Sequence, residues 1–365
     1  MVDERQRTVA GDANSSGCRR RLFAHPLFWP ALALFLLLAG NGLFNPGFLG
    51  LQWRQGHVYG NLVDILLRAA PLMLVSLGMT LVIAVRGLDI SVGAVLAIAA
   101  AVAAWMIGGA LVVEHGTQVA VTRFPLALVI VGALLAAAAC GLWNGLLVVG
   151  AGMQPIIATL ILMVAGRGIA QLVTGGQVLT IYYTPYFFLG NGYLLGLPFA
   201  LFVVAAVYAV LHLALRRTAL GLFVRAIGGN PRAAYVAGVK ARSITVGLYM
   251  FCALMAGVAG LLVSSNVKSA DANNAGLLLE LDAILAVTLG GTPLGGGRFS
   301  LAGSLLGALI IQTLTTTIYS IGVPPQVNMV VKAVLVFAVM LLQSVAFRGA
   351  VRKLWTRHQA AGSRP

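Results

Sequence analysis

Charged side chains are scarce in this chain. Only 9% of its 365 residues are Asp, Glu, Lys or Arg, and only nine are acidic, whereas an ordinary soluble domain carries about a quarter charged residues. With 60% hydrophobic residues, the composition excludes a soluble enzyme and a disordered chain. Long apolar runs without β-barrel alternation predict an all-α polytopic membrane protein, because lipid offers backbone groups no partner outside a helix or a closed barrel.

Cysteine, histidine and nucleotide-binding motifs are also scarce. The three cysteines lie in a basic tail and in two apolar runs, so they predict no structural disulfide. The five histidines lack the spacing of metal ligands, and no phosphate loop of the Gly-x-x-x-x-Gly-Lys-Ser/Thr type occurs. We therefore expect this chain to have no catalytic site, no metal site and no cofactor of its own.

The few charges are placed unevenly, and their placement predicts the topology. The net charge is +15, and most of the 24 basic residues lie in 1–27, 216–243 and 348–365. Basic residues that flank membrane spans stay in the cytoplasm. The sequence thus predicts cytoplasmic tails at 1–27 and 348–365 and a transmembrane domain over 28–347 with a cytoplasmic central loop at 216–243. The lipid bilayer accounts for this charge pattern without a nucleic-acid partner.

Ten apolar runs are candidate membrane spans, since a span needs about 20 apolar residues. They are Phe28–Phe44, Ala69–Val85, Ile90–Val113, Pro125–Gly150, Pro155–Thr174, Gly196–Leu215, Ile244–Ser264, Leu281–Leu289, Leu301–Ile321 and Val327–Phe347. The eighth run is too short to cross alone, so we expect a broken span that continues into Gly290–Gly297. A second break is expected at Arg86–Asp89. Irregular backbone at membrane depth is tolerated only where protein buries it or it lines a wet cavity.

Polar side chains within the apolar runs are candidates for a solute pathway. Arg167 and Gln171 are one helical turn apart and share a face of the fifth span. Such groups suit a neutral polyhydroxylated solute, and they equally serve to hold helices together. Arg167 favours the pathway, because an intramembrane charge usually faces a cavity or a partner. Asp89 stands at a helix start, where it can cap the third span or contact a solute.

The central loop contains a helix-start signal. Asn230 is a typical N-cap residue, Pro231 suits the first helical position, and Gly238 suits the residue that follows a helix. A short helix over 231–237 is therefore predicted on the cytoplasmic side. From these residues alone, the loop is either a docking site or a solvated connector.

Several motifs follow one another along the chain in a defined order. They are Gly87–Ala94, Gly141–Gly145, Gln154–Pro155, Thr159–Leu160, the central loop, Glu280–Val287, and the glycine pairs Gly290–Gly291 and Gly296–Gly297. Together they resemble the permeases of ABC importers for ribose, arabinose and galactofuranose. The segments Ala165–Leu172 and Ala270–Gly276 are most similar to a galactofuranose permease. Arg86 and Arg232 depart from the family pattern, which commonly has a small residue and an acidic residue there.

The resemblance implies a permease in the bacterial inner membrane that translocates a monosaccharide, galactofuranose or a related sugar. Its implied partners are a second permease subunit, identical or homologous, a cytoplasmic ABC ATPase subunit, and a periplasmic or extracellular sugar-binding protein. ATP and Mg would be used by the ATPase partner and not by this chain. The alternative is an ion-coupled secondary transporter of a small polar solute, which predicts acids near the midplane and no docking loop.

Three groups of site residues follow from the resemblance and the polar pattern. The ATPase-coupling residues are Asn230, Pro231, Ala233, Ala234 and Gly238. The translocation-pathway residues are Asp89, Ser91, Asn144, Gln154, Thr159, Arg167 and Gln171. The residues of the outer mouth, which meet the binding protein or are simply solvated, are Asp271, Asn273, Asn274, Glu280 and Asp282.

Overall fold

The structure is a computed structural model that describes most of the chain. The described residues are 27–45, 47–54, 56–108, 110–114, 117–320, 322, 327, 329–334 and 337. The predicted basic tails, apart from Leu27, and most of the predicted tenth span lie outside them. The chain divides into two compact units, Met1–Thr313 and Leu314–Pro365. The elements and sites below belong to the first unit, apart from residues 314–320 at the end of the last helix.

Helices make up most of the described chain. The longer ones are α2 (Phe28–Phe44), α3 (Asn61–Ala84), α4 (Val92–Ile107), α5 (Leu126–Val149), α6 (Pro155–Thr174), α8 (Phe199–Arg217), α11 (Ala241–Val267) and α13 (Leu301–Ser320). The shorter ones are α7 (Thr184–Asn191), α9 (Leu220–Gly229), α10 (Pro231–Val236) and α12 (Leu279–Leu289). Within the described ranges, the helices long and apolar enough to cross a membrane are α3, α5, α6, α8, α11 and α13. A polytopic helical membrane protein is thereby confirmed, while ten spans stay a prediction.

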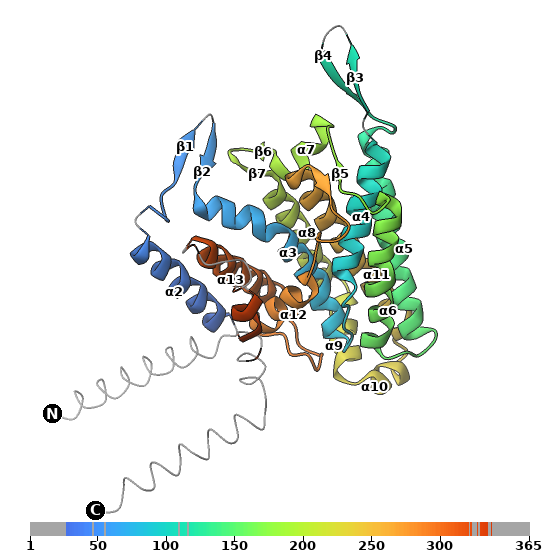
Figure 1. Cartoon of the computed structure of the whole chain (residues 1–365). Helices are drawn as coiled ribbons and strands as arrows, with labels where there is room; N and C mark the ends of the chain where they lie inside the picture. Colours follow the sequence, from blue (N-terminus) through green and yellow to red (C-terminus); the bar gives the residue numbers. More distant parts are fainter. Residues whose placement is uncertain are drawn as a thin grey trace, which may run out of the picture. The chain divides into compact units, whose positions relative to one another are not determined.

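Short antiparallel strand pairs connect the helices at one end of the bundle (Figure 1). They are β1 (Gln52–Arg54) with β2 (His57–Tyr59), β3 (Ala110–Glu114) with β4 (Thr117–Val121), β5 (Leu179–Thr180) with β8 (Ser269–Ala270), and β6 (Tyr193–Leu194) with β7 (Leu197–Pro198). Strands β1, β2, β4, β5, β6 and β8 lie in connections between predicted spans, whereas β7 lies at the start of the predicted sixth span. The third predicted span was drawn too long, because its end at 110–113 belongs to β3.

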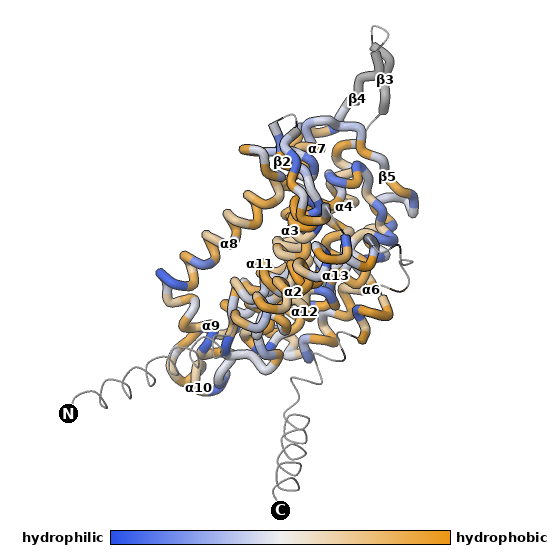
Figure 2. Tube along the Cα trace, turned by 90° about the vertical axis from the view of Figure 1, so that its left-hand side faces the viewer, coloured by the Kyte–Doolittle hydropathy of each residue, from blue (hydrophilic) through white to orange (hydrophobic). Residues whose placement is uncertain are grey.

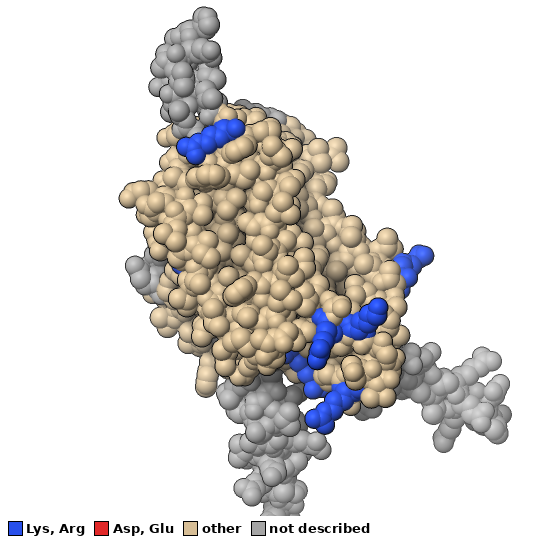
Figure 3. Space-filling view, turned by 90° about the vertical axis from the view of Figure 1, so that its right-hand side faces the viewer, with Lys and Arg blue, Asp and Glu red and all other residues tan. Residues whose placement is uncertain are grey.

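The opposite end of the bundle carries α9 and α10 (Figure 1). Figure 2 shows hydrophobic helices between two ends that carry most of the hydrophilic colour. On the face drawn in Figure 3, most Lys and Arg side chains gather toward one end and no acidic side chain is visible. This distribution agrees with the cytoplasmic placement of the central loop.

Helix α11 is the centre of the packing. It contacts α3, α4, α5 and α7, and α4 in turn packs against α6. Glycines allow the helices to approach closely: a Cβ at Gly78 would lie 2.8 Å from the Cα of Cys252, and one at Gly141 would lie 2.7 Å from the Cα of Met250. Small residues serve this purpose in membranes, where close van der Waals contact drives helix association.

Both predicted breaks are present, and they lie side by side. Helix α3 ends at Ala84 and α4 begins at Val92, while α12 ends at Leu289 and α13 begins at Leu301. The backbone N–H of Gly297 in the second break donates to the carbonyl oxygen of Ala84 at 2.8 Å. A hydrogen bond within the protein therefore satisfies irregular backbone at the breaks, as irregular backbone at membrane depth requires.

Candidate functional site

The predicted short helix in the central loop is present as α10. Its N-cap is Asn230, whose side-chain oxygen accepts hydrogen bonds from the backbone N–H groups of Arg232 and Ala233, each at 3.1 Å. Pro231 occupies the first turn, where its missing N–H costs no hydrogen bond. The helix ends at Val236, one residue before the predicted end, because Ala237 already turns away.

The end of α10 is closed by a glycine turn. Gly238 has a φ of 79°, a left-handed conformation that glycine adopts without a Cβ clash. Its N–H donates to the carbonyl of Tyr235, and the N–H of Val239 donates to the carbonyl of Ala234, both at 3.0 Å. Ala234 is buried, whereas Tyr235 and Val236 are 76% and 85% exposed. The helix is thus firmly placed and presents apolar side chains outward.

A buried cluster of polar side chains lies at the break between α3 and α4. One carboxylate oxygen of Asp89 accepts hydrogen bonds from the backbone N–H of Ser91 at 3.0 Å, the Ser91 hydroxyl at 2.6 Å and the Asn144 amide at 3.3 Å. The Asn144 amide also donates to the Ser91 hydroxyl at 2.8 Å. All three residues are fully buried. Asp89 therefore organises the start of α4, although the N-cap position itself belongs to Ser91.

Thr159 joins α6 to the same break. Its hydroxyl donates to the carbonyl of Pro155 at 2.9 Å and accepts from the N–H of Ile90 at 3.3 Å. Thr159 is fully buried, whereas Gln154, the N-cap of α6, is exposed. The structure thus joins four predicted pathway residues, Asp89, Ser91, Asn144 and Thr159, inside the protomer and leaves Gln154 outside their cluster.

Arg167 and Gln171 hold the loop between α11 and α12 instead. The Arg167 guanidinium donates to the carbonyl oxygens of Ala272 at 3.2 Å and Ala275 at 2.5 Å. The Gln171 amide donates to the side-chain oxygen of Asn273 at 2.6 Å. The two residues do share a helix face, as predicted, and that face belongs with the outer mouth and not with the Asp89 cluster.

The outer-mouth loop is ordered by its own carboxylate. One oxygen of Asp271 accepts from the backbone N–H groups of Asn273 at 2.9 Å and Asn274 at 3.2 Å, and the other accepts from the Asn274 side-chain amide at 2.7 Å. The Asn274 amide bond is the main reason that the pKa of Asp271 lies below its ordinary value of 3.8. Desolvation opposes this shift, and the Arg167 charge adds to it.

Exposure differs among the predicted outer-mouth residues. Asn273 and Asn274 are exposed, and Asp271 and Asp282 are half-buried. Glu280 is only 5% exposed and lies against the backbone of α4 at Gly93. The simple solvation considered for Glu280 is therefore wrong, because helix packing encloses its carboxylate.

Comparison with known proteins places the chain in a family. Residues 61–340 match the family described as "Branched-chain amino acid transport system / permease component". The chain belongs to this family. This permease has named relatives of similar length. None of the solved structures gives a significant match.

Three relatives show how much of the permease is shared. A galactofuranose transporter permease protein, YtfT of Escherichia coli, is 45% identical over 93% of this chain and 96% of its own. A fructose import permease protein, FruF of Bifidobacterium longum, is 36% identical over 89% of each chain. A ribose import permease protein, RbsC of Haemophilus influenzae, is 33% identical over 85% of this chain and 90% of its own.

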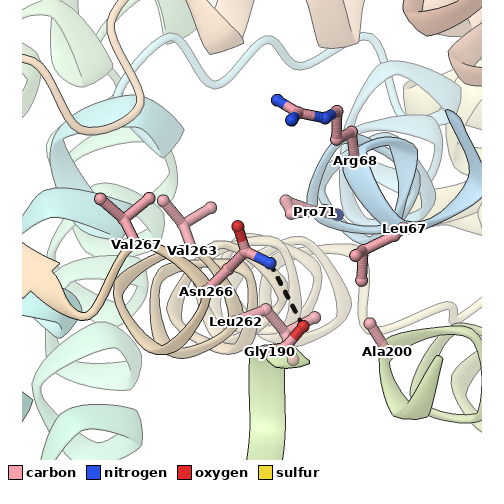
Figure 4. A pocket seen from close by; sticks show the side chains of 9 residues that line it. All are labelled: Leu67, Arg68, Pro71, Gly190, Ala200, Leu262, Val263, Asn266 and Val267. Atoms are coloured by element: carbon pink, nitrogen blue, oxygen red, sulfur yellow. Dashed lines mark hydrogen bonds between the residues drawn. The ribbon is translucent and has the colours of Figure 1, made fainter. Parts of the chain in front are cut away.

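The permease contains a further pocket that the sequence reasoning missed, with mostly apolar walls and two polar side chains, Arg68 and Asn266. It lies between α3 and α11, with α7 and α8 closing its base (Figure 4). Its lining residues are Leu67, Arg68, Pro71, Gly190, Ala200, Leu262, Val263, Asn266 and Val267. Arg68 was overlooked because the second span was predicted to begin at Ala69, whereas α3 begins at Asn61. An isolated charge one residue ahead of an apolar run was the available signal.

Proposed function

We propose that this permease is the membrane-spanning subunit of an ATP-driven ABC importer whose solute is galactofuranose. The observation that carries the proposal is α10, a capped helix with an exposed apolar surface at the end of the bundle where the basic central loop lies. Beside it is a recess of about 710 Å³ lined by residues that include Phe223, Gly238, Lys240 and Ser243. A connector needs neither a firm cap nor an apolar surface, but a docking element needs both.

The relatives support the solute. Their printed names cover galactofuranose, fructose and ribose, all monosaccharides, and the relative named for galactofuranose shares 45% identity, against 36% and 33% for the other two. Hydrogen-bonding groups without a paired counter-charge, such as Gln171 and Asn273 at the outer mouth, suit a neutral polyhydroxylated solute.

The topology of the permease and the partners of the importer are part of the same proposal. In this proposal the chain has ten spans over 28–347, both tails and the 216–243 loop are cytoplasmic, and the membrane is a bacterial inner membrane. A second permease subunit completes the pathway, and an ATPase partner uses ATP and Mg at α10. A soluble sugar-binding protein delivers the sugar at Asp271–Glu280. Movement of α10 during ATP hydrolysis then switches the pathway between its outward-open and inward-open states.

Reconstitution tests this function against an ion-coupled transporter. The permease, its co-purified ATPase partner and its sugar-binding protein are placed in liposomes, and uptake of labelled galactofuranose is measured. We expect uptake that requires ATP and is unaffected when ionophores collapse proton and sodium gradients. Uptake that persists without ATP under a proton or sodium gradient would refute the proposal. The permease alone is expected to hydrolyse no ATP.

A further inference from the structure

The pocket between α3 and α11 opens at the outer end of the bundle. Asn266 is the penultimate residue of α11, Ala200 is the second residue of α8, and Arg68 is the eighth residue of α3. These helix ends lie on the side of the outer hairpins, opposite α10 (Figure 1). A solute arriving from outside therefore reaches this pocket before it reaches the buried Asp89 cluster.

Asn266 presents a fixed acceptor to the pocket. Its side-chain nitrogen donates to the carbonyl of Gly190 at 3.3 Å and to the side-chain oxygen of Asn191 at 3.0 Å. With both bonds on the nitrogen, the amide oxygen is turned toward the opening (Figure 4). An acceptor held in this way does not have to be reorganised when a hydroxyl group arrives.

Arg68 presents donors from the opposite wall. Its guanidinium is exposed at the rim, across the opening from Asn266 (Figure 4). No residue in the described part of the chain forms a hydrogen bond or an ion pair with it. An arginine in a membrane helix is costly and normally faces a cavity or a partner. Here it faces the cavity.

The size and walls of the pocket favour a small polar molecule. Its volume is about 140 Å³, which is room for about five water molecules at about 30 Å³ each and is of the order of one sugar ring. Leu67, Pro71 and Val263 supply apolar wall beside the donors and the acceptor. Apolar walls with a few polar groups are typical of a small-molecule site, and the small volume suits weak binding of a partly enclosed solute.

We propose that this outer pocket is a low-affinity monosaccharide site, at which the sugar first binds the permease after it leaves the binding protein. Arg68 donates hydrogen bonds to sugar hydroxyl oxygens, and the amide oxygen of Asn266 accepts one from a sugar hydroxyl. The inference rests on the proposed sugar-import function and adds to it an unassigned site with named donors and acceptor.

Substitution of Arg68 tests the site in the reconstituted importer. Arg68→Gln should lower the maximal uptake rate about tenfold, the range for loss of hydrogen bonds to a charged donor, while the affinity of the binding protein for the complex is unchanged. Arg68→Lys should recover part of the rate. Arg123→Gln, which removes another exposed arginine at the outer end, is the matched control and should transport normally.

A cysteine at the wall gives a direct readout. Val263→Cys, in a protein whose three native cysteines are replaced by serine, should react with a small water-soluble thiol reagent. Galactofuranose without binding protein should slow the reaction, and Arg68→Gln should abolish this protection. The same measurements apply to the intact assembly with its ATPase.

The possible results separate the explanations. Normal uptake in Arg68→Gln together with no protection by sugar would overturn the site. Loss of binding-protein affinity without sugar protection would also overturn it and would identify Arg68 as a contact for an acidic side chain of the binding protein. If the unmodified assembly shows no ATP-driven galactofuranose uptake, the proposed function itself fails, whatever the variants do.

Discussion

Arg86 and Gly228 join the break between α3 and α4 to the end of α9. The Nε of Arg86 donates to the carbonyl oxygen of Gly228 at 2.7 Å, and its Nη2 donates to that of Gly229 at 2.6 Å. These carbonyls lie at the negative end of the α9 helix dipole, where a cation is favoured. The next residue along the chain is Asn230, the cap of α10, so the proposed docking helix is tied to the segment that leads into Asp89.

The backbone conformation of Arg86, from which these two hydrogen bonds are made, is strained. Arg86 has a φ of 65°, and the left-handed region costs a residue with a Cβ roughly 1–2 kcal/mol. The two charged hydrogen bonds offset this cost, since such bonds contribute about 1.5–3 kcal/mol each. A glycine at position 86 would remove both the backbone strain and the two hydrogen bonds, and these changes have opposite effects on stability.

We predict that Arg86→Gly impairs coupling more than stability. The variant should still bind the ATPase partner through α10, but sugar uptake per ATP hydrolysed should fall at least about fivefold, the lower range of typical coupling energies. The measurement is the ratio of uptake to hydrolysis in proteoliposomes. An unchanged ratio together with a lower melting temperature would show that Arg86 stabilises the fold and has no role in coupling.

Gly228 and Gly229 provide a matched pair for packing. A Cβ at Gly228 would lie 1.9 Å from the carbonyl oxygen of Ala84 and 2.4 Å from the backbone nitrogen of Gly297, whereas one at Gly229 would meet nothing within 4 Å. Gly228→Ala should therefore destabilise the protein by about 1–3 kcal/mol through overpacking. Gly229→Ala should be neutral or slightly stabilising. Thermal unfolding in detergent measures both, and equal melting temperatures would contradict the close approach.

Gly238 tests whether α10 docks the ATPase. Gly238→Trp adds about 1 kcal/mol of backbone strain at a positive φ and places a bulky ring beside the docking helix, so co-purification of the ATPase and sugar uptake should both be lost. Gly152→Trp is the control, because Gly152 also has a positive φ of 67° and open space around it, in a loop before α6. Retention of the ATPase by the Gly238 variant would place the docking surface elsewhere.

The Asp271 loop should lose order in acid. The pKa of Asp271 is lowered in the folded loop from 3.8, so its contribution is complete above that value and disappears as the pH falls through the lower, folded pKa. Protection of the Asn273 and Asn274 amides from hydrogen exchange, corrected for intrinsic rates, should be constant above pH 3.8 and decline below it.

Neutral variants supply the comparison for this loop. Asp271→Asn should show weak protection of both amides at every pH, because an amide oxygen is a poorer acceptor than a carboxylate. Asp64→Asn changes a different carboxylate, which is exposed in the first turn of α3, and should leave the loop protected. A loop equally protected in Asp271→Asn would show that Arg167 and Gln171 hold it without the carboxylate.

Local signals in the sequence were sufficient for some features. The apolar runs determined the helical membrane fold, since hydrophobic length alone decides whether a helix can cross lipid. Asn230, Pro231 and Gly238 determined α10, because a cap and a glycine stop act on backbone groups within a few residues. The motif order determined the family, which the match over residues 61–340 confirmed.

Tertiary structure decided which distant residues meet. Asp89 and Asn144 are far apart in the chain, as are Arg86 and Gly228, and only the packing of α3, α5 and α9 brings each pair together. The same packing placed Arg167 and Gln171 at the outer mouth and enclosed Glu280. It also produced the outer pocket, because α3 begins at Asn61, before its predicted apolar run, and places Arg68 across the opening from Asn266. Periodicity specifies a helix face, but the neighbour of that face depends on how the helices pack.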